Sequence, residues 1–468
     1  MTETQNTLDV IWPLLLHLSN VVGVLMALLL VSRVLRSPRM PAATVGWLFA
    51  IILVPLLGIP LYLTFGERKL KSFIKRKTKI ALPCTCETYR HPVHSLLVTL
   101  NIPASSKDNR VDFHADGVVA YQQLLTLLQG AEHSIDIAIF ALGDDAVGHE
   151  VLSRLTGKAA QGVKVRLLLD GVGSFKLPKA RLRPLVQSGG EIAWFIPVLH
   201  RPLHGKTNLR NHRKIIIVDE QKVWSGGRNL ASEYLGPDCS CARWVDLSYC
   251  LYGSAVGSYR AIFEADWHFA TGASSEEKRV EVAAQIAAGD SWIQVVPSGP
   301  DVADDPIYAA ILTACYKAKQ RISIVTPYYI PDSGVQEALK LAALRGVKVD
   351  LILPAQSNHR LADIARNRFL RELAQASVRI WLLPGGMVHA KALVVDRTFA
   401  MAGSANLDIR SLFLNCEVMS AFYTKKDIVW LEHWLASLRV RSERYGLKPV
   451  SAFTEVLEGL VLLGAYQL

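Results

Sequence analysis

A sparse polar pattern that occurs twice constrains this chain more than any other feature. Two triplets fit the pattern H-x-K-x4-D: His212, Lys214 and Asp219, and then His389, Lys391 and Asp396. In each copy an Asn follows the His by 17 residues, at Asn229 and at Asn406. With 13 His residues in the chain, on the order of 0.03 matches to this pattern are expected by chance. The two copies therefore indicate a duplicated domain with shared chemistry.

Each motif is followed by a short apolar run, at residues 215–218 and 392–395. Such β-branched runs predict buried strands. Residues two apart on a strand face the same side, so each His and its Lys are expected to point together. The Asp has the opposite parity, and we therefore predict a turn-anchoring role for Asp219 and Asp396. An imidazole beside an ammonium, present twice, suggests chemistry on a phosphodiester. For a single copy, a satisfied polar pair near the surface would be the simpler interpretation.

The repeat extends beyond the motifs and predicts the fold class. Residues 134–140 match 321–327, and residues 161–170 match 345–354. Each pair encloses a stretch with apolar residues at helical spacing. Each half thus consists of a strand, a helix, a strand and then the H-x-K strand. This order predicts an α/β fold with right-handed crossovers and a sheet covered on both faces, the halves being related by a pseudo-twofold axis.

The N-terminal region carries two long apolar runs, at residues 10–31 and 42–64. Each has about the 20 residues that cross a bilayer core, and their tandem order disfavours the alternative of buried core helices. Three Arg residues lie between the runs, whereas seven Lys and Arg residues follow the second run by residue 79. The positive-inside rule therefore predicts a cytoplasmic catalytic domain. The predicted domains are a transmembrane helical hairpin at residues 1–66, a basic juxtamembrane linker at 67–110, a first half at 111–285 and a second half at 286–468.

The metal-binding residue types give no sign of a cofactor. The seven Cys residues are odd in number and scattered, so they do not predict a disulfide framework. Cys84-x-Cys86 and Cys239-x-Cys241 are spaced too closely for the usual zinc pattern. No carboxylate cluster or His-x-His set lies near the two motifs. The sequence therefore predicts catalysis without a metal or another cofactor.

The paired motifs resemble those of the phospholipase D superfamily, and the whole chain is similar to the bacterial cardiolipin synthases of that superfamily. The likeness runs almost from end to end. It includes Gly-Glu-Arg at 66–68, Gly-Gly-x-Asn at 226–229, Asp-Trp at 266–267, Ser-Gly-Pro at 298–300, Thr-Pro-Tyr-Tyr-Ile-Pro-Asp at 326–332, Gly-Ser-Ala-Asn-Leu-Asp-Ile-Arg-Ser at 403–411 and Asn-x-Glu at 415–417. The resemblance implies two phospholipase D-like α/β sandwich halves behind a transmembrane hairpin.

The family mechanism implies a site where the two halves meet, because each half supplies one His. One imidazole would attack phosphorus to form a phosphohistidine, and the other would protonate the leaving alkoxide and then deprotonate the incoming alcohol. We assign His212 as the nucleophile and His389 as the acid/base, although the symmetry of the motifs does not decide between them. The non-bridging oxygens would be held by Lys214, Lys391, Asn229 and Asn406.

Each imidazole also needs an acceptor for its other ring nitrogen. By family position, Asp246 would orient His212 and Glu417 would orient His389. An ordinary surface carboxylate is the alternative for either residue.

Two departures from the family pattern lie near the first motif. Residues 244–248 are Trp-Val-Asp-Leu-Ser, where the family usually has Trp-Arg-Asp followed by Thr-His. An unusual Asp-Cys-Ser-Cys insertion precedes them at 238–241. These changes leave the acceptor alcohol open. Arg228 could contact a lipid phosphate or glycerol headgroup, or form a salt bridge to a loop.

Two further segments each have two interpretations. Basic residues near the first motif could line a path for anionic headgroups or form a solvated loop: His200, Arg201, His204, Lys206, Arg210 and Arg213. Residues 453–463 carry apolar side chains at helical spacing. They could lie on the membrane surface, although docking on the domain is favoured.

The resemblance implies an inner-membrane transphosphatidylase with two spans that condenses two phosphatidylglycerols into cardiolipin and releases glycerol. Its partners would be anionic phospholipids, chiefly phosphatidylglycerol, and the membrane itself. A phospholipase D-type hydrolase, or a transferase with phosphatidylethanolamine or a small alcohol as acceptor, would use the same residues. The net charge of +11 also fits a nuclease, but the apolar hairpin argues against nucleic acid as a partner. A non-catalytic membrane scaffold is disfavoured because both motifs are intact.

Overall fold

The structure, a computed structural model of the chain, describes residues 25–26, 28–32, 34, 41–65, 89–197, 209–272, 287–447 and 449–462. The chain divides into two compact units. An N-terminal unit contains helices α2 and α3, and a larger unit contains every element from α5 to α15.

The N-terminal unit contains two short helices, α2 (Pro41–Leu53) and α3 (Pro55–Phe65), which divide at Val54. Pro55 supplies the reason, because it lacks an N–H and disfavours helical backbone in the residue before it. These two helices share residues 42–64, for which the sequence predicts one continuous span. Most of the other predicted span, residues 10–31, lies outside the described residues. Within the described part of the chain, no helix has both the length and the apolarity that crossing a membrane requires.

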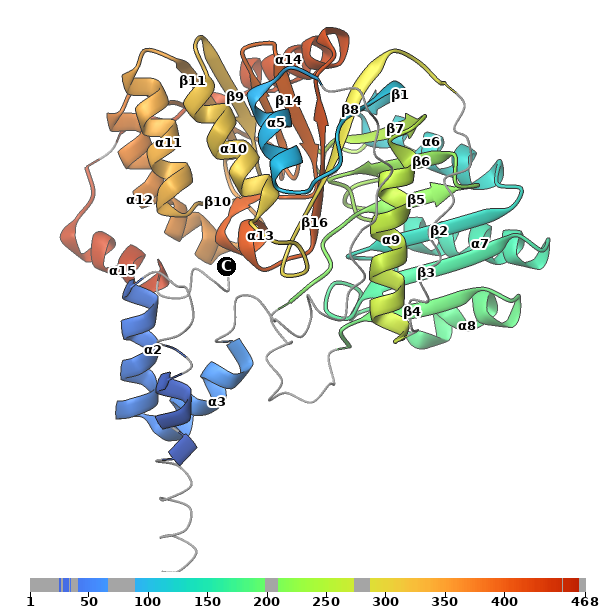
Figure 1. Cartoon of the computed structure of the whole chain (residues 1–468), viewed down its shortest axis with the longest axis horizontal. Helices are drawn as coiled ribbons and strands as arrows, with labels where there is room; N and C mark the ends of the chain where they lie inside the picture. The colour runs from blue at the N-terminus through green and yellow to red at the C-terminus, as the bar shows by residue number, and fades with distance from the viewer. Residues whose placement is uncertain are drawn as a thin grey trace, which may run out of the picture. The chain divides into compact units, whose positions relative to one another are not determined.

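A mixed sheet of 15 strands runs through the larger unit (Figure 1). The first half supplies β1 (Ser106–His114), β2 (Ser134–Ile139), β3 (Lys164–Asp170), β4 (Glu191–Phe195), β5 (Ile215–Val218), β6 (Lys222–Gly226) and β7 (Ser248–Tyr252). The second half supplies β8 (Ser291–Ser298), β9 (Arg321–Val325), β11 (Lys348–Pro354), β12 (Arg379–Leu383), β13 (Ala392–Val395), β14 (Phe399–Gly403), β16 (Glu417–Phe422) and β17 (Glu443–Arg444). A separate parallel pair consists of β10 (Tyr329–Ile330) and β15 (Leu407–Asp408).

The strand order confirms the duplication. The first half runs β4-β3-β2-β5-β6-β7-β1 inward from one edge, and the second half runs β12-β11-β9-β13-β14-β16-β8 inward from β17 at the other edge. Strands β2, β3 and β4 are parallel, as are β9, β11 and β12. The H-x-K strands β5 and β13 run antiparallel to β2 and β9. The matching orders around the β1–β8 junction give the halves their pseudo-twofold relation.

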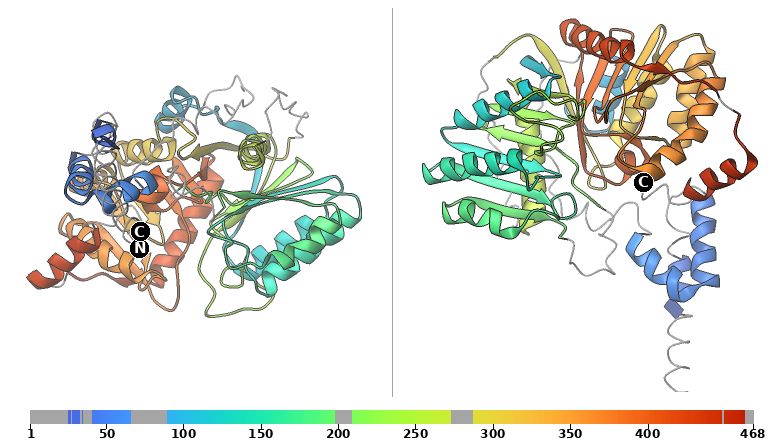
Figure 2. Two further views of the ribbon diagram at one scale, coloured as in Figure 1. Left: turned by 90° about the horizontal axis from the view of Figure 1, so that it is seen from below. Right: turned by 180° about the vertical axis from the view of Figure 1, so that it is seen from behind.

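Helices cover both faces of the sheet, as the α/β pattern predicts (Figure 2). In the first half, one face carries α6 (Gly117–Gln129), α7 (Ala146–Ala160) and α8 (Lys179–Gln187), and the other carries α9 (Val256–Thr271). In the second half, one face carries α10 (Pro306–Lys317), α11 (Ser333–Leu344) and α12 (Arg360–Gln375), and the other carries α14 (Lys425–Val440). The remaining helices of this unit are α5 (Pro92–Thr99), α13 (Ile409–Phe413) and α15 (Ala452–Leu462).

The segment predicted as a linker contains folded structure at its end. Helix α5 and the first residues of β1 fall within residues 67–110. Val93 and Leu97, one helical turn apart on α5, are buried in the core of the second half, although they precede the first half in the sequence. Strand β1 pairs with β7 of the first half and with β8 of the second. The start of the larger unit therefore joins both halves.

Candidate active site

The two H-x-K motifs lie at the junction of the halves, immediately before their strands. β5 begins at Ile215 and β13 at Ala392, so each His and Lys precedes the strand rather than lying on it as predicted. The reason is that the backbone of each His pairs with the opposite half. His212 N donates to Cys416 O at 2.9 Å, and His389 N donates to Val245 O at 2.7 Å.

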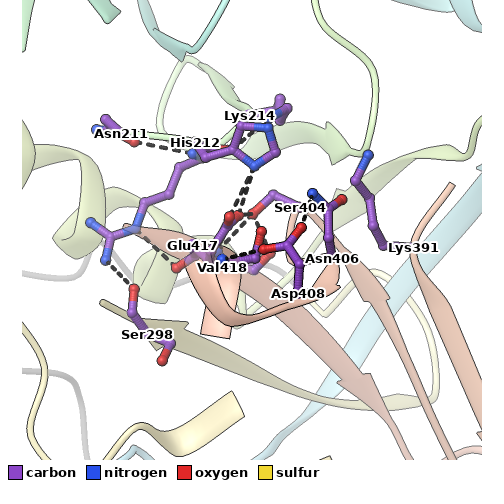
Figure 3. A network of polar contacts seen from close by, with 12 residues as sticks. Asn211, His212, Lys214, Ser298, Lys391, Ser404, Asn406, Asp408, Glu417 and Val418 are labelled. Carbon is purple, nitrogen blue, oxygen red and sulfur yellow. Dashed lines mark hydrogen bonds and ion pairs between the residues drawn. The ribbon is translucent and has the colours of Figure 1, made fainter. Parts of the chain in front are cut away.

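These backbone bridges place each imidazole beside a carboxylate of the other half. Cys416 precedes Glu417, and Val245 precedes Asp246. His212 Nδ1 lies 2.9 Å and 3.1 Å from the two carboxylate oxygens of Glu417 (Figure 3). His389 Nδ1 lies 2.7 Å from Asp246 Oδ2.

The structure therefore corrects the predicted pairing of these residues. Sequence position assigned Asp246 to His212 and Glu417 to His389, but the partners are exchanged. The register of the cross-half bridges determines which carboxylate meets which imidazole, and motif spacing contains no information about that register.

Both carboxylates are held in their ionised form. Burial alone would raise the pKa of Glu417, but His212, through its hydrogen bond, and the charge of Lys214 outweigh burial and lower it. Burial likewise opposes ionisation of Asp246, yet Lys391 and His389 lower its pKa to about 2. Ionised carboxylates only accept hydrogen bonds, so both imidazoles donate through Nδ1–H. This tautomer leaves the lone pair on each Nε2 for chemistry.

The imidazoles themselves are neutral in the ligand-free protein. Burial lowers the pKa of His212 to about 4 and that of His389 to about 3; the nearby Lys charges lower it further and the carboxylates oppose this. A neutral imidazole can act as a nucleophile. A proton for a leaving group must therefore arrive when an anionic substrate binds, because a nearby negative charge favours the protonated ring.

Each Lys folds back on its own His. Lys214 Nζ donates to His212 O at 2.7 Å, and Lys391 Nζ donates to His389 O. Lys391 Nζ also lies 3.1 Å from His389 Nε2. Burial lowers the pKa of Lys391 to about 8 and that of Lys214 well below its usual value. A phosphodiester at this point would stabilise the charged form of both amines and would lie within their reach.

The two Asn residues also lie at this junction. Asn229 accepts from Ala141 N at 3.3 Å and donates to Tyr234 Oη at 3.2 Å. Asn406 Nδ2 donates to Asp408 Oδ2 at 2.9 Å, and its Oδ1 is buried without a hydrogen-bond partner among the described residues.

Asp219 and Asp396 lie at the other ends of β5 and β13. The carboxylate of Asp219 accepts from backbone N–H groups of residues 132–134 at 2.7–3.2 Å. That of Asp396 accepts from residues 319–321 at 2.6–2.8 Å. Each Asp thus holds the turn that leads into β2 or β9, in agreement with a turn-anchoring role.

Several site residues carried no usable sequence signal. Ser404 donates to the Glu417 carboxylate. In the sequence, only its position two residues before Asn406 links it to the second motif. Aromatic rings line both imidazoles. Phe140 lies 5.0 Å from His212 between ring centroids, and Tyr234 and Trp244 lie 5.0 Å and 5.6 Å from His389. Aromatic residues are common in cores, so sequence alone does not single these out.

The basic residues near the first motif form internal contacts where they are described. Arg228 is fully buried and donates to the backbone oxygens of His114, Ala115 and Asp246. It therefore supports the backbone of an orienting carboxylate, which is closer to the loop-contact interpretation than to the headgroup interpretation. Two members of the predicted basic group are also buried in ion pairs: Arg210 with Asp170, and Arg213 with Asp266 and Asp301. The other members of that predicted group, at 200, 201, 204 and 206, lie outside the described residues.

The described part of the chain can be examined for groups of metal-ligating side chains. There, no three His, Cys, Asp or Glu side chains gather in a way that could hold a metal ion. The chemistry available at the junction is that of two imidazoles, two carboxylates and two amines.

Family comparison agrees with this arrangement. The family described as the phospholipase D-like domain of cardiolipin synthase matches residues 124–267 and 311–439. The phospholipase D-nuclease N-terminal family matches residues 24–67.

Similar proteins with known names cover most of the chain. A cardiolipin synthase of Alkalihalophilus pseudofirmus is 32% identical over 84% of this chain and 82% of its own length. Cardiolipin synthase 2 of Bacillus anthracis is 34% identical over 83% of this chain and 79% of its own. The major cardiolipin synthase of Bacillus subtilis is 30% identical over 93% and 96%.

A solved structure shares the fold. The phosphatidylserine synthase of Haemophilus influenzae superposes with a TM-score of 0.57 and 13% identity, covering 76% of this chain and 92% of that protein. At this identity the likeness concerns the fold alone.

Proposed function

The chain belongs to the cardiolipin synthase family of phospholipase D-like proteins, and on that premise we propose that it joins two phosphatidylglycerols into cardiolipin and releases glycerol. It is a phosphatidyltransferase. The observation that carries the proposal is the pair of buried imidazoles, each held through Nδ1 by an ionised carboxylate, so that the lone pair of each ring is on Nε2. Such a pair suits transfer through a covalent intermediate.

We assign the nucleophile to His212. Lys391 Nζ lies 3.1 Å from Nε2 of His389, whereas no group in the described residues hydrogen-bonds Nε2 of His212. In the first step, Nε2 of His212 would form a bond to phosphorus as the bond from phosphorus to the glycerol oxygen breaks, and His389 would deliver a proton to that oxygen. In the second step, His389 would take the proton of the acceptor hydroxyl as its oxygen displaces His212.

The remaining site residues have supporting roles in this scheme. Lys214 and Lys391 would balance the charge that builds on the non-bridging oxygens, together with the amides of Asn229 and Asn406. Phosphatidylglycerol suits the site as both donor and acceptor, because it carries the phosphodiester and a free hydroxyl.

We also propose that the N-terminal unit embeds in the inner membrane as a hairpin of residues 10–31 and 42–64, leaving the larger unit in the cytoplasm. Supporting this, the described residues of the N-terminal unit bury a small cluster, which contains Ile51 and Tyr62, and expose many large apolar side chains. Exposed apolar surface of this kind marks a membrane or protein contact. The basic residues at 68–79 suit a cytoplasmic lipid surface.

The nucleophile assignment has a direct test. With a phosphatidyl ester of p-nitrophenol, the leaving group departs without needing a proton. His389→Ala should therefore still release a burst of about one nitrophenol per site, and His212→Ala should release none. A burst from His212→Ala but not from His389→Ala would exchange the two roles.

The reaction itself is tested by supplying labelled phosphatidylglycerol to the full chain in a bilayer and identifying the products by mass spectrometry. Labelled cardiolipin and glycerol, both lost in His212→Ala, would support the proposal. Phosphatidic acid as the sole product would make the protein a hydrolase. Product formed only after adding phosphatidylethanolamine or a small alcohol would change the acceptor.

A further inference from the structure

We propose that the edge of the active-site junction rests on a phospholipid bilayer through an apolar rim built from both halves. This apolar rim consists of Val172 and Phe175 from the first half and Phe453, Val456, Leu457 and Leu460 from the second. The inference rests on the proposed function, since a lipid substrate lies in a bilayer.

The first-half part of the rim is a turn that follows β3 and packs beside His212. Asp170, at the end of β3, accepts from Asn211 N at 2.9 Å, directly before the His. Ser174 donates to Phe140 O at 3.1 Å, and the Phe140 ring contacts the imidazole. Val172 lies between these anchors and Phe175 directly follows the second; both side chains are exposed, Phe175 by 69%.

The second-half part of the rim is α15, whose C-terminal end packs on the segment that follows the second motif. Its Val461 and Leu462 pack in a cluster with Tyr328, Ile330 and Ile409. Ile330 pairs with Asp408, the residue that accepts from Asn406. Helix α15 also lies against α12 (Figure 1). The end of α15 therefore sits on the loop that carries the second motif.

Helix α15 is docked through Glu458 and its apolar C-terminal end, and it exposes an apolar stripe. Glu458 is buried and binds Arg371 at 2.9 Å and 2.5 Å. Residues 453, 456, 457 and 460 have the spacing of one helical stripe, yet all four are exposed, with 78% of Phe453 and 60% of Leu460 accessible. A helix that served only to cover the domain would bury this stripe. The helix can therefore dock on the domain through one side while its exposed stripe contacts a membrane, so the two interpretations of residues 453–463 do not exclude each other.

A bilayer fits this surface better than a second protein. A single stripe of four side chains is well below the roughly 800 Å² per partner that a stable protein interface needs. Beside it, α12 begins with exposed Arg360 and Leu361, next to Ala362 of the same cluster. A basic residue at the edge of an apolar patch matches an anionic lipid surface. A lipid whose phosphate reaches the buried imidazoles must keep its acyl chains in the bilayer, and each part of the rim adjoins a segment next to one of the two motifs.

The test compares two substrates in the same particle. The full chain, in phosphatidylcholine nanodiscs, receives either long-chain phosphatidylglycerol in the bilayer or water-soluble dihexanoyl-phosphatidylglycerol. For Phe175→Asp combined with Leu460→Asp, we expect the rate on bilayer lipid to fall by about tenfold or more, with the soluble substrate turned over within about twofold of the unmodified protein.

Matched controls precede the N-terminal ends of β11 and β4, whereas the first-half part of the rim follows the C-terminal end of β3. Leu344 ends α11 just before β11 begins, and Val186 lies in the last turn of α8 before β4. Leu344 is 67% exposed and Val186 is 54% exposed, so Leu344→Asp combined with Val186→Asp makes the same chemical change away from the site. Both rates should stay unchanged in this control. Equal losses on both substrates, or no loss on either, in the rim variant would overturn the proposal.

A second measurement does not depend on turnover. Benzoylphenylalanine placed at Phe453 should form photo-adducts with lipid acyl chains, detected by mass spectrometry, whereas the same group at Leu344 should form none. Cross-linked protein dimers without lipid adducts would assign the rim to a second copy and overturn the proposal. Lipid adducts in a protein that makes no cardiolipin from either substrate would sustain the rim while refuting the proposed reaction.

Discussion

At the scale of single residues, His212 and His389 are buried imidazoles whose Nδ1–H groups are held by carboxylates of the opposite half. Removing either negative charge while keeping the shape should leave an imidazole in the wrong tautomer or orientation. We expect Glu417→Gln and Asp246→Asn each to lower kcat by about 10²- to 10⁴-fold.

Steady-state assays with labelled phosphatidylglycerol measure this loss. Glu432→Gln, a carboxylate of α14 that pairs with Arg397, is the control for a general charge effect and should keep its activity. A Glu417→Gln variant with normal kcat would show that His212 does not depend on that carboxylate.

The pH dependence follows from the lowered pKa values of the two imidazoles. Productive chemistry needs one neutral and one protonated ring, but in the free protein both are neutral above about pH 4. Binding must therefore take up a proton, and uptake becomes easier as the pH falls. We expect kcat/KM to rise as the pH is lowered from 8 towards 5.

Rate profiles, with calorimetry in buffers of different ionisation enthalpy to count the protons taken up, check this expectation. An acid limb near pH 6.5, where an ordinary His titrates, would contradict it.

The residue types of the site were predictable from the sequence, but their partners were not. The repeated spacing identified the His, Lys, Asp and Asn residues because chemistry requires those types at fixed offsets. The exchange of Asp246 and Glu417 depends on backbone bridges between segments far apart in the chain, at Val245 and Cys416. The role of Arg228 stayed open because a charged side chain is rarely fully buried, and only the structure shows which backbone oxygens it binds.

At the scale of elements, Asp219 and Asp396 hold the turns before β2 and β9 through backbone N–H groups. Asp219→Asn keeps the size but removes the charge that these donors stabilise. We expect this substitution to lower the free energy of unfolding by about 1–3 kcal/mol and to change kcat by less than about twofold, because the carboxylate does not contact the imidazoles.

Denaturant unfolding measures the loss, with Asp112→Asn, at a partly exposed carboxylate of β1, as the control. Burial opposes ionisation of Asp219, but the backbone donors of Ser134, Glu132 and His133 lower its pKa below 3.8. A lowered pKa in a folded carboxyl group means that its stabilisation is present above the unfolded value and disappears as the pH falls through the folded value. A kcat loss as large as that of His212→Ala would instead place Asp219 in the chemistry.

The local sequence pattern predicted the strands of the repeat, but it missed an element whose burial depends on distant contacts. The strands at 134–139, 164–170 and 348–354 form as their apolar runs indicate. Helix α5 was missed because it is short and lies behind a basic segment, and its burial depends on the distant core of the second half. A tertiary contact of this kind has no local sequence signature.

At the scale of the whole larger unit, the halves share one sheet and several buried contacts. Tyr259 Oη lies 2.8 Å from Tyr249 Oη and 2.9 Å from Ser420 Oγ of the other half. Strand β1 joins β7 to β8. We expect the two halves to unfold together, because separating them would expose these contacts and the sheet edges at the junction.

Hydrogen exchange followed by mass spectrometry under increasing denaturant tests this expectation. The backbone amides of β2 and β9, equivalent strands of the two halves, should report the same opening free energy. Loss of protection in one half well before the other would contradict it.

The crossed carboxylates also bear on how the halves could diverge. Each imidazole takes its acceptor from the other half, so an early unduplicated form would have needed a twofold dimer to complete any site. Once joined in one chain, the two acceptors were free to become different residues, and they are now Glu417 and Asp246. A substitution near the carboxylate of one half therefore changes the surroundings of the imidazole of the other half. We expect substitutions around the two histidines to be coupled across the junction.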